Sequence, residues 1–225
     1  MNSAPPVSVD ADPIVEFYKL GIDKDLILEY LSKSHEERLI NLENVIAFIH
    51  RLHSPGMARR REGVPPATTH FKALLASLSN HDVSFVIIGG AAAVLHGSAR
   101  VTYDLDIVYD RSFDNLERIV RSLAPFRPYI KGAPPGLPFR FDVAALKRGL
   151  NFTFVTSAGT IDLLGYLAGI GSFDTLHENT ADIDMFGARY RLLCLDALIV
   201  SKVAPGRAKD LEGVAELEII RELLG

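Results

Sequence analysis

Two aspartates, Asp104 and Asp106, stand two positions apart in the segment 103–109, which reads YDLDIVY. A β-strand directs successive side chains to opposite faces, so we expect both carboxylates on one face and Leu105 and Ile107 on the other. Two neighbouring carboxylates repel each other, and a cation between them removes that repulsion. Oxygen ligands suit Mg²⁺, which proteins hold with one or two carboxylates, waters and substrate phosphates. The spacing therefore predicts a strand that carries a divalent-cation site.

A third aspartate, Asp162, stands between Ile161 and Leu163 in another apolar segment, 160–164. A single acid in an apolar strand is costly unless a partner or a metal ion compensates its charge. We therefore interpret Asp162 as a third carboxylate of the same site. The alternative is an aspartate on an edge strand that faces water.

A second pair of acids, Asp182 and Asp184, has the same spacing as the first pair. It follows the polar segment 178–181, and no glycine turn precedes it. We therefore expect these two side chains on the surface, in a loop or a strand.

The first aspartate pair is preceded by a turn that could bind phosphate. The apolar run 85–88 predicts a short buried strand, and Gly89 and Gly90 end it in a tight turn. Glycine backbones permit close approach by a ligand. The segment 91–95 then predicts a short helix whose first N–H groups attract anions, and Arg100 adds a positive charge. A phosphate site is thus expected next to the cation site.

The combined pattern resembles the signature of the nucleotidyltransferase superfamily, which shares the DNA polymerase β fold. More narrowly, the chain resembles the small bacterial branch that contains the toxins of AbiE-like toxin–antitoxin systems, from about Ser84 to the C-terminus. Many members of the superfamily have Gly-Ser where this chain has a glycine pair, whereas the AbiE-like branch has the second glycine. The residues that carry the resemblance are Gly89, Gly90, Gly97, Arg100, Thr102, Asp104 and Asp106.

This resemblance implies an α+β fold, with a mixed, mostly antiparallel central sheet flanked by helices. It also implies that Asp104, Asp106 and Asp162 hold Mg²⁺, and that Asp162 acts as base for the attacking hydroxyl. The end of the chain resembles the lysine-rich closing motif of the same branch, whose basic groups lie near the triphosphate. The implied nucleotide-binding residues are Gly89, Gly90, Arg100, Thr102, Lys202 and Lys209.

Composition excludes several other classes of protein. The chain has 225 residues, a formal net charge of −4 and one cysteine, Cys194, so neither a basic nucleic-acid binder nor an internal disulfide is indicated. No apolar run is long enough for a membrane span, and the N-terminus lacks the core of a secretion signal, so we expect a cytoplasmic protein. The motifs of P-loop NTPases, zinc proteases and α/β-hydrolases are absent from the sequence.

The chain divides by pattern into an N-terminal helical extension with a linker, residues 1–62, and a nucleotidyltransferase domain, residues 63–225. Asp12 and Asp23 are expected to cap two short helices, and Ser34 with Glu37 has the spacing of a capping box before a longer helix. The segment 54–66, rich in proline, glycine and arginine, is the expected linker. The helices either pack on the second domain or another subunit, or bind a partner such as an antitoxin.

The second domain contains further expected elements. Thr68 or Thr69 should cap a helix that runs to about residue 80, and the proline-rich segment 125–138 should form a loop. Residues 117–148 contain seven basic and two acidic side chains, a local charge of 7 − 2 = +5. This segment is either a solvated surface or a groove for a triphosphate or an RNA acceptor.

These observations predict a Mg²⁺-dependent nucleotidyltransferase that moves a nucleoside monophosphate from a nucleoside triphosphate, for example ATP, to a hydroxyl acceptor. The acceptor would be an RNA such as tRNA, or a protein, and the resemblance adds a toxin–antitoxin role with an antitoxin partner. A homodimer is the other expected association, and no membrane partner is expected. The alternative function is a catalytically inactive binding or regulatory module with the same fold.

Overall fold

The computed structural model describes residues 12–53, 68–134, 136 and 138–225. The strands are β1 (Phe85–Ile88), β2 (Asp104–Tyr109), β3 (Tyr129–Ile130), β4 (Asn151–Thr156), β5 (Gly159–Leu164), β6 (Thr180–Met185) and β7 (Ala188–Leu193). The α-helices are α1 (Pro13–Lys19), α2 (Lys24–Leu31), α3 (His35–His53), α4 (Phe71–Asn80), α5 (Gly89–Leu95), α6 (Phe113–Leu123), α7 (Val143–Arg148), α8 (Leu195–Val203) and α9 (Leu211–Leu224). Short 3₁₀ helices include η1 (Ala124–Phe126) and η4 (Ala208–Asp210).

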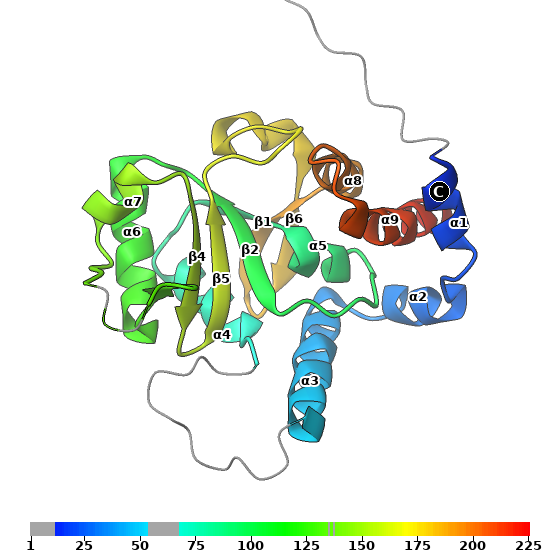
Figure 1. Cartoon of the computed structure of the whole chain (residues 1–225), viewed down its shortest axis with the longest axis horizontal. Helices are drawn as coiled ribbons and strands as arrows, with labels where there is room; N and C mark the ends of the chain where they lie inside the picture. Colours follow the sequence, from blue (N-terminus) through cyan, green and yellow to red (C-terminus); the bar gives the residue numbers. More distant parts are fainter. Residues whose placement is uncertain (1–11, 54–67, 135, 137) are drawn as a thin grey trace, which may run out of the picture.

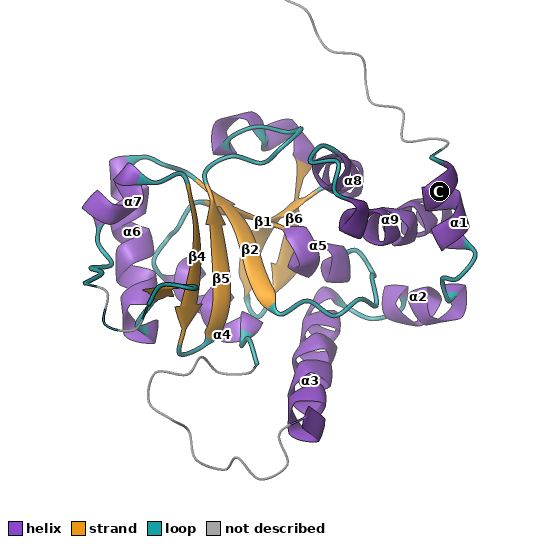
Figure 2. Ribbon diagram, viewed as in Figure 1, coloured by secondary structure: helices purple, strands orange, loops and turns teal. Residues whose placement is uncertain are grey.

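The strands form one seven-stranded sheet in the order β3-β4-β5-β2-β1-β7-β6. Antiparallel pairs join β1 to β2, β3 to β4, β4 to β5 and β6 to β7, whereas β2 pairs in parallel with β5 and β1 with β7. Figures 1 and 2 show this sheet between α6 and α7 on one side and α5, α8 and α9 on the other. The predicted α+β class, with a mixed and mostly antiparallel sheet flanked by helices, is confirmed.

Burial along the two central strands follows their sequences. All four residues of β1 are buried, as its continuous apolar run predicts. In β2, Leu105 and Ile107 are fully buried, whereas Asp104 and Asp106 are half-buried on the other face. The period of two therefore places the aspartates where the sequence predicts.

The N-terminal helices begin where their capping residues predict. Asp12 accepts a hydrogen bond from the Ile14 N–H at 2.9 Å, and Asp23 caps α2 in the same way. The capping box is also formed, because the Ser34 N–H donates to Glu37 Oε2 at 2.7 Å and the Glu37 N–H donates to Ser34 Oγ at 3.2 Å. These local bonds satisfy N–H groups that have no partner within the helix.

The N-terminal helices share a hydrophobic core with the sheet. Leu39, Leu42 and Ile46 of α3 are buried in that core, and α1 packs along α9, close to the C-terminus (Figure 1). The buried Arg38 guanidinium donates to the Leu95 carbonyl at the end of α5. Arg38 also donates to the carbonyls of Tyr30 and Leu31. This packing is one of the two expected roles of these helices, while the division at residue 62 stays a prediction.

Two local expectations were wrong. Neither Thr68 nor Thr69 caps α4: the N-cap is His70, without a side-chain bond, because the Thr69 hydroxyl donates to the Tyr103 carbonyl before β2. The segment 125–138 is more than a loop, since it contains most of η1 and all of β3. The expected linker, 54–66, lies outside the described residues. Among the described helices, none is both long and apolar enough to cross a bilayer.

Candidate active site on strands β2 and β5

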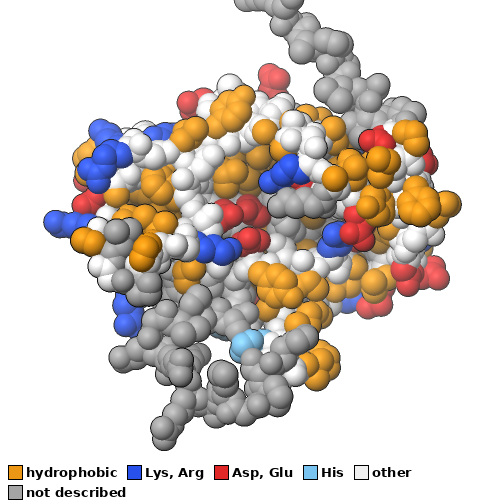
Figure 3. Space-filling view, viewed as in Figure 1, with side chains coloured by type: hydrophobic (Ala, Val, Ile, Leu, Met, Phe, Trp, Pro, Cys, Tyr) orange, Lys and Arg blue, Asp and Glu red, His pale blue; other side chains and the backbone are white. Residues whose placement is uncertain are grey.

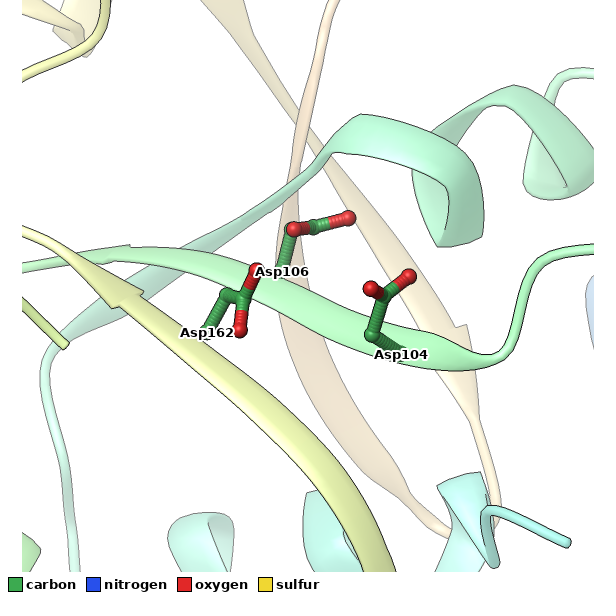
Figure 4. A group of neighbouring side chains, drawn as sticks. All are labelled: Asp104, Asp106 and Asp162. Carbon is green, nitrogen blue, oxygen red and sulfur yellow. The ribbon is translucent and has the colours of Figure 1, made fainter. Parts of the chain in front are cut away.

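Three carboxylates come together where β2 and β5 run in parallel. Asp106 lies directly opposite Asp162 in the register of the two strands, and Asp104 precedes Asp106 on the same face of β2. One carboxylate oxygen from each of these residues lies within 4.8 Å of the others. Figure 4 shows the three side chains gathered on one face of the two strands. The strand pairing thus assembles acids that are far apart in the sequence, and β5 is an inner strand, so the edge-strand alternative for Asp162 does not apply.

Nearby groups of the described chain offset the negative charge of this cluster only in part. Asp162 Oδ1 is buried and has no hydrogen-bond partner among the described residues. Burial, followed by the nearby carboxylates of Asp104 and Asp162, raises the pKa of Asp106 from an ordinary 3.8 to about 8. Such a group of half-buried carboxylates with an orphaned oxygen is the environment that a divalent cation with oxygen ligands would relieve. The three aspartates therefore fit a divalent cation.

Asp162 differs from Asp106 in its surroundings. Burial is the main reason that its pKa is raised, and a hydrogen bond with the Thr153 side chain on β4 opposes this effect. The charge of Lys131, which follows β3, also lowers the pKa of Asp162. Asp162 is thus the acid of the cluster that faces the β3 and β4 side of the sheet.

The glycine pair is packed directly against the acids. Gly89 has a positive φ of +63°, and a Cβ added there would lie 2.1 Å from Asp106 Oδ2. The helix α5 begins at Gly89 itself, slightly earlier than predicted, and the Gly90 N–H donates to Asp106 Oδ2 at 3.3 Å. Only glycine provides both the left-handed backbone and the space that the Asp106 side chain occupies.

Thr102 also belongs to this cluster. Its hydroxyl donates a hydrogen bond to Asp104 Oδ1 at 2.9 Å, a contact that the sequence interpretation missed. The signal was available, because Thr102 stands two positions before Asp104, and an extended chain brings such residues to the same face. The resemblance places Thr102 on the nucleotide, whereas the structure places its hydroxyl on an acid.

Two of the predicted basic nucleotide contacts, Lys202 and Arg100, lie near the start of α9. The positive charge of Lys202, on α8, acts to lower the pKa of Asp106. Burial is the main reason that the pKa of Lys202 itself is lowered. A Cβ added at Gly213 would lie 4.0 Å from both Lys202 Nζ and Arg100 Nε, so these two cations share the start of α9. Arg100 is paired with Glu212 at 2.9 Å. Figure 3 shows acidic side chains at the centre of this face with basic side chains on both sides.

Lys209 cannot be added to this group, because its side chain lies outside the described residues. Its neighbour Arg207 forms an ion pair with Asp210 at 2.6 Å at the start of α9. Of the predicted basic nucleotide contacts, Lys202 acts by its charge on Asp106, whereas Arg100 lies close to Lys202 and pairs with Glu212.

The second Asp-x-Asp pair lies elsewhere. Asp182 and Asp184 are exposed on β6, the last strand of the sheet order, which confirms the surface expectation. Asp184 forms an exposed ion pair with Arg189 of the neighbouring strand. No other acid joins this pair to make a group able to hold a metal ion within the described ranges.

The basic segment 117–148 is partly occupied by local contacts. Arg118 donates to the Asp82 carbonyl at 3.1 Å, Arg140 lies 3.5 Å from Asp142, and the Lys147 ammonium lies over the Phe113 ring. The charge of Lys131, in this segment, acts on Asp162 of the acid cluster. The segment thus presents positive charge beside Asp162.

Comparisons with known proteins give a limited result. No family model and no curated protein matches the chain. Among solved structures, a candidate nucleotidyltransferase from Thermotoga maritima aligns at 16% identity over 67% of this chain and 88% of its own, with a TM-score of 0.37. The antibiotic-resistance factor ANT(2'')-Ia aligns at 16% identity over 68% of this chain and 87% of its own, with a TM-score of 0.39.

Proposed function

We propose that the protein is a divalent-cation-dependent nucleotidyltransferase. The observation that carries this proposal is the meeting of Asp104, Asp106 and Asp162 on one face of β2 and β5, with oxygens within 4.8 Å of one another, directly beside the Gly89–Gly90 turn. A carboxylate cluster with the positive charge of Lys202 beside it suits a substrate that brings its own phosphates. The superfamily resemblance, including its AbiE-like branch, supports the same activity.

Mg²⁺ is the ion proposed for the cluster, because three carboxylates offer only oxygen ligands. When bound, such an ion neutralises phosphate oxygens and lowers the pKa of a hydroxyl that it contacts. Asp104 and Asp106 would hold it from β2, and Asp162 from β5. The unpartnered Asp162 Oδ1 and the raised pKa of Asp106 support this assignment.

The nucleoside triphosphate, with ATP as the first candidate, would place its phosphates between the glycine turn and the cations. Asp106 and Thr102 fill the space that side chains at Gly89 and Gly90 would take, so this placement is supported by charge: Lys202 acts on Asp106, and Arg100 lies close to Lys202. Lys202 is well suited to this role, because no ion pair ties it to another residue of the described chain. Lys209 is added on the resemblance alone.

In the proposed reaction the oxygen of an acceptor hydroxyl attacks the α-phosphorus of the nucleotide. A new P–O bond forms, the bond from the α-phosphorus to the bridging oxygen breaks, and pyrophosphate leaves. Asp162 accepts the proton of the hydroxyl. This role is assigned to Asp162 on the resemblance.

The acceptor is proposed to be an RNA such as tRNA, with a protein hydroxyl as the alternative. The positive charge of segment 117–148, which reaches the cluster through Lys131, supports an anionic acceptor on the Asp162 side. A toxin–antitoxin role, with an antitoxin or a second copy as partner, follows from the resemblance and is proposed on that basis.

Label transfer tests the proposal. The full chain is incubated with each of the four labelled nucleoside triphosphates, Mg²⁺, and either total RNA or a protein extract. We expect one nucleotide to label RNA, and we expect EDTA or Asp104→Asn to remove the label. If no nucleotide labels RNA or protein while the purified chain is folded, the proposal fails.

A second candidate function is a catalytically inactive binding module. Apolar side chains gathered at α1 favour it, since Ile14 and Phe17 are 51% and 71% exposed on that helix and Leu20, directly after it, is 86% exposed. Large exposed apolar side chains mark interaction surfaces when they gather. This function would be selected if the chain transfers no label but still binds the cation and the nucleotide.

A further inference from the structure

The role of Thr102 follows from where its one hydroxyl proton goes. Thr102 Oγ1 donates to Asp104 Oδ1 at 2.9 Å. A threonine hydroxyl has a single proton and two lone pairs. With the proton given to Asp104, the oxygen presents only lone pairs to its surroundings, and these repel phosphate oxygens. The hydroxyl is therefore poorly suited to bind a nucleotide phosphate directly.

The Thr102 side chain is also held in place from its other side. A Cβ added at Gly90 would lie 2.3 Å from Thr102 Oγ1 and 2.5 Å from Thr102 Cβ. The threonine thus fills the space beside the bare Gly90 backbone, between the glycine turn and Asp104. Because a β-branched side chain has few χ1 rotamers, this packing fixes the direction of the hydroxyl.

We infer that Thr102 is a positioning residue for the cation ligand Asp104. Its hydroxyl holds one carboxylate oxygen, so that the carboxylate keeps a single orientation and turns its remaining lone pairs towards Asp106 and Asp162. Gly90 contributes to the same arrangement, since any side chain there would displace Thr102. This inference rests on the proposed function only in that it requires a cation at the three acids.

Direct Mn²⁺ binding tests the inference without reference to activity. Free Mn²⁺ gives an electron paramagnetic resonance signal that disappears on binding, so a titration of the full chain yields a dissociation constant. Thr102→Val has nearly the same shape but lacks the hydroxyl, whereas Thr102→Ser keeps it. We expect Thr102→Val to weaken Mn²⁺ binding roughly tenfold, as for other residues that orient metal ligands, and Thr102→Ser to stay within about twofold of the parent.

A matched control is available in Thr175→Val. The Thr175 hydroxyl donates to the Ser172 carbonyl, also at 2.9 Å, and no cluster acid is its partner. We expect its Mn²⁺ affinity to equal that of the parent. Circular dichroism and thermal unfolding of each variant identify any loss of fold, and Thr102→Ala, which also lacks the hydroxyl, keeps the inference testable if Thr102→Val does not fold.

The outcomes separate this inference from the function on which it rests. If the parent binds Mn²⁺ and folded Thr102→Val binds it equally well, the positioning role is overturned and the cation site stands. If Thr102→Val raises the KM for the nucleotide but leaves Mn²⁺ affinity unchanged, the hydroxyl serves the nucleotide, and the inference is again wrong. If the parent binds no Mn²⁺, the inference and the proposed cation site both fail.

Discussion

The aspartate pairs on β2 and β6 have the same spacing, but they lie in different surroundings. β2 is an inner strand, flanked by β1 and β5, whereas β6 is the last strand of the sheet order. Asp104 and Asp106 are half-buried and meet a third acid on β5, while Asp182 and Asp184 are exposed. The spacing decides only that two carboxylates share a face. The neighbouring strands decide whether another acid joins them and whether water remains to solvate their charges.

The largest expected difference between the two pairs is in catalysis. Replacing Asp104 or Asp106 by Asn removes a carboxylate from the cation site, and we expect the transfer rate to fall roughly 10³-fold. Asp182→Asn and Asp184→Asn should stay within about twofold of the parent. Label transfer by folded variants measures this difference, and equal losses at both pairs would contradict the assignment of the site to β2.

The glycines near each pair should respond differently to an added methyl group. Gly89 and Gly187 both have positive φ, +63° and +76°, so alanine at either position costs about 1–2 kcal/mol of backbone strain. At Gly89 the new Cβ would also collide with the Asp106 side chain, whereas at Gly187 no atom lies within 4 Å.

We therefore expect Gly89→Ala to lower the free energy of unfolding by about 3 kcal/mol or more and to abolish transfer. Gly187→Ala should lower it by about 1 kcal/mol and leave transfer intact. Denaturant unfolding measures both values. If Gly89→Ala had only a mild effect on stability and activity, close packing of the turn against Asp106 would not be required for either.

Cation binding should stabilise the chain through β2 and not through β6. At a cation concentration about 100 times the dissociation constant, mass action adds about 2.7 kcal/mol to stability. We expect Mg²⁺ to raise the Tm of the parent and of Asp184→Asn by the same amount, and to leave Asp106→Asn nearly unchanged. A Tm rise in Asp106→Asn equal to that of the parent would place the bound ion elsewhere.

The pH dependence of stability should distinguish the pairs in metal-free protein. The folded chain raises the pKa of Asp106 from 3.8 to about 8, so the folded state keeps this proton to a higher pH than the unfolded state does. This contribution to stability is complete below pH 3.8 and is lost as pH rises to about 8, by at most about 1.4 kcal/mol per pH unit.

Asp106→Asn should therefore flatten the fall of stability between pH 5 and 8 in the presence of EDTA. Asp184→Asn, an exposed substitution, should keep the slope of the parent. Thermal unfolding at several pH values measures both slopes. If the comparison with Asp106→Asn showed that the Asp106 carboxyl makes the parent more stable as pH rises over this range, the burial of that carboxyl would be contradicted.

Features set by neighbouring residues could be predicted from the sequence. The caps at Asp12 and Asp23, the Ser34–Glu37 box and the alternation along β2 depend on residues within a few positions, and each was found where predicted. The predicted cap of α4 failed for the opposite reason. Thr69 forms a contact with Tyr103, far along the chain, which no local pattern reveals.

In the candidate site, too, some features could be predicted from local sequence and others depend on how distant segments pack. The three aspartates could be proposed because each stands out in an apolar strand, but their meeting depends on the parallel pairing of β2 with β5. The approach of Lys202 to Asp106 depends on how α8 packs, and the two-residue strand β3 is too short to produce a period. The contact of Thr102 with Asp104 could have been predicted from their spacing alone.

The parallel pairing of β2 and β5 also has a consequence for folding kinetics. Parallel neighbours need a long crossover connection, and contacts between distant segments form late, after the entropy of closing that loop has been lost. An ion held by both strands would therefore stabilise the native state much more than the folding transition state. Unfolding should then become slower in proportion to occupancy while the folding rate changes little, so cation supply would set how long each folded molecule resists proteolysis.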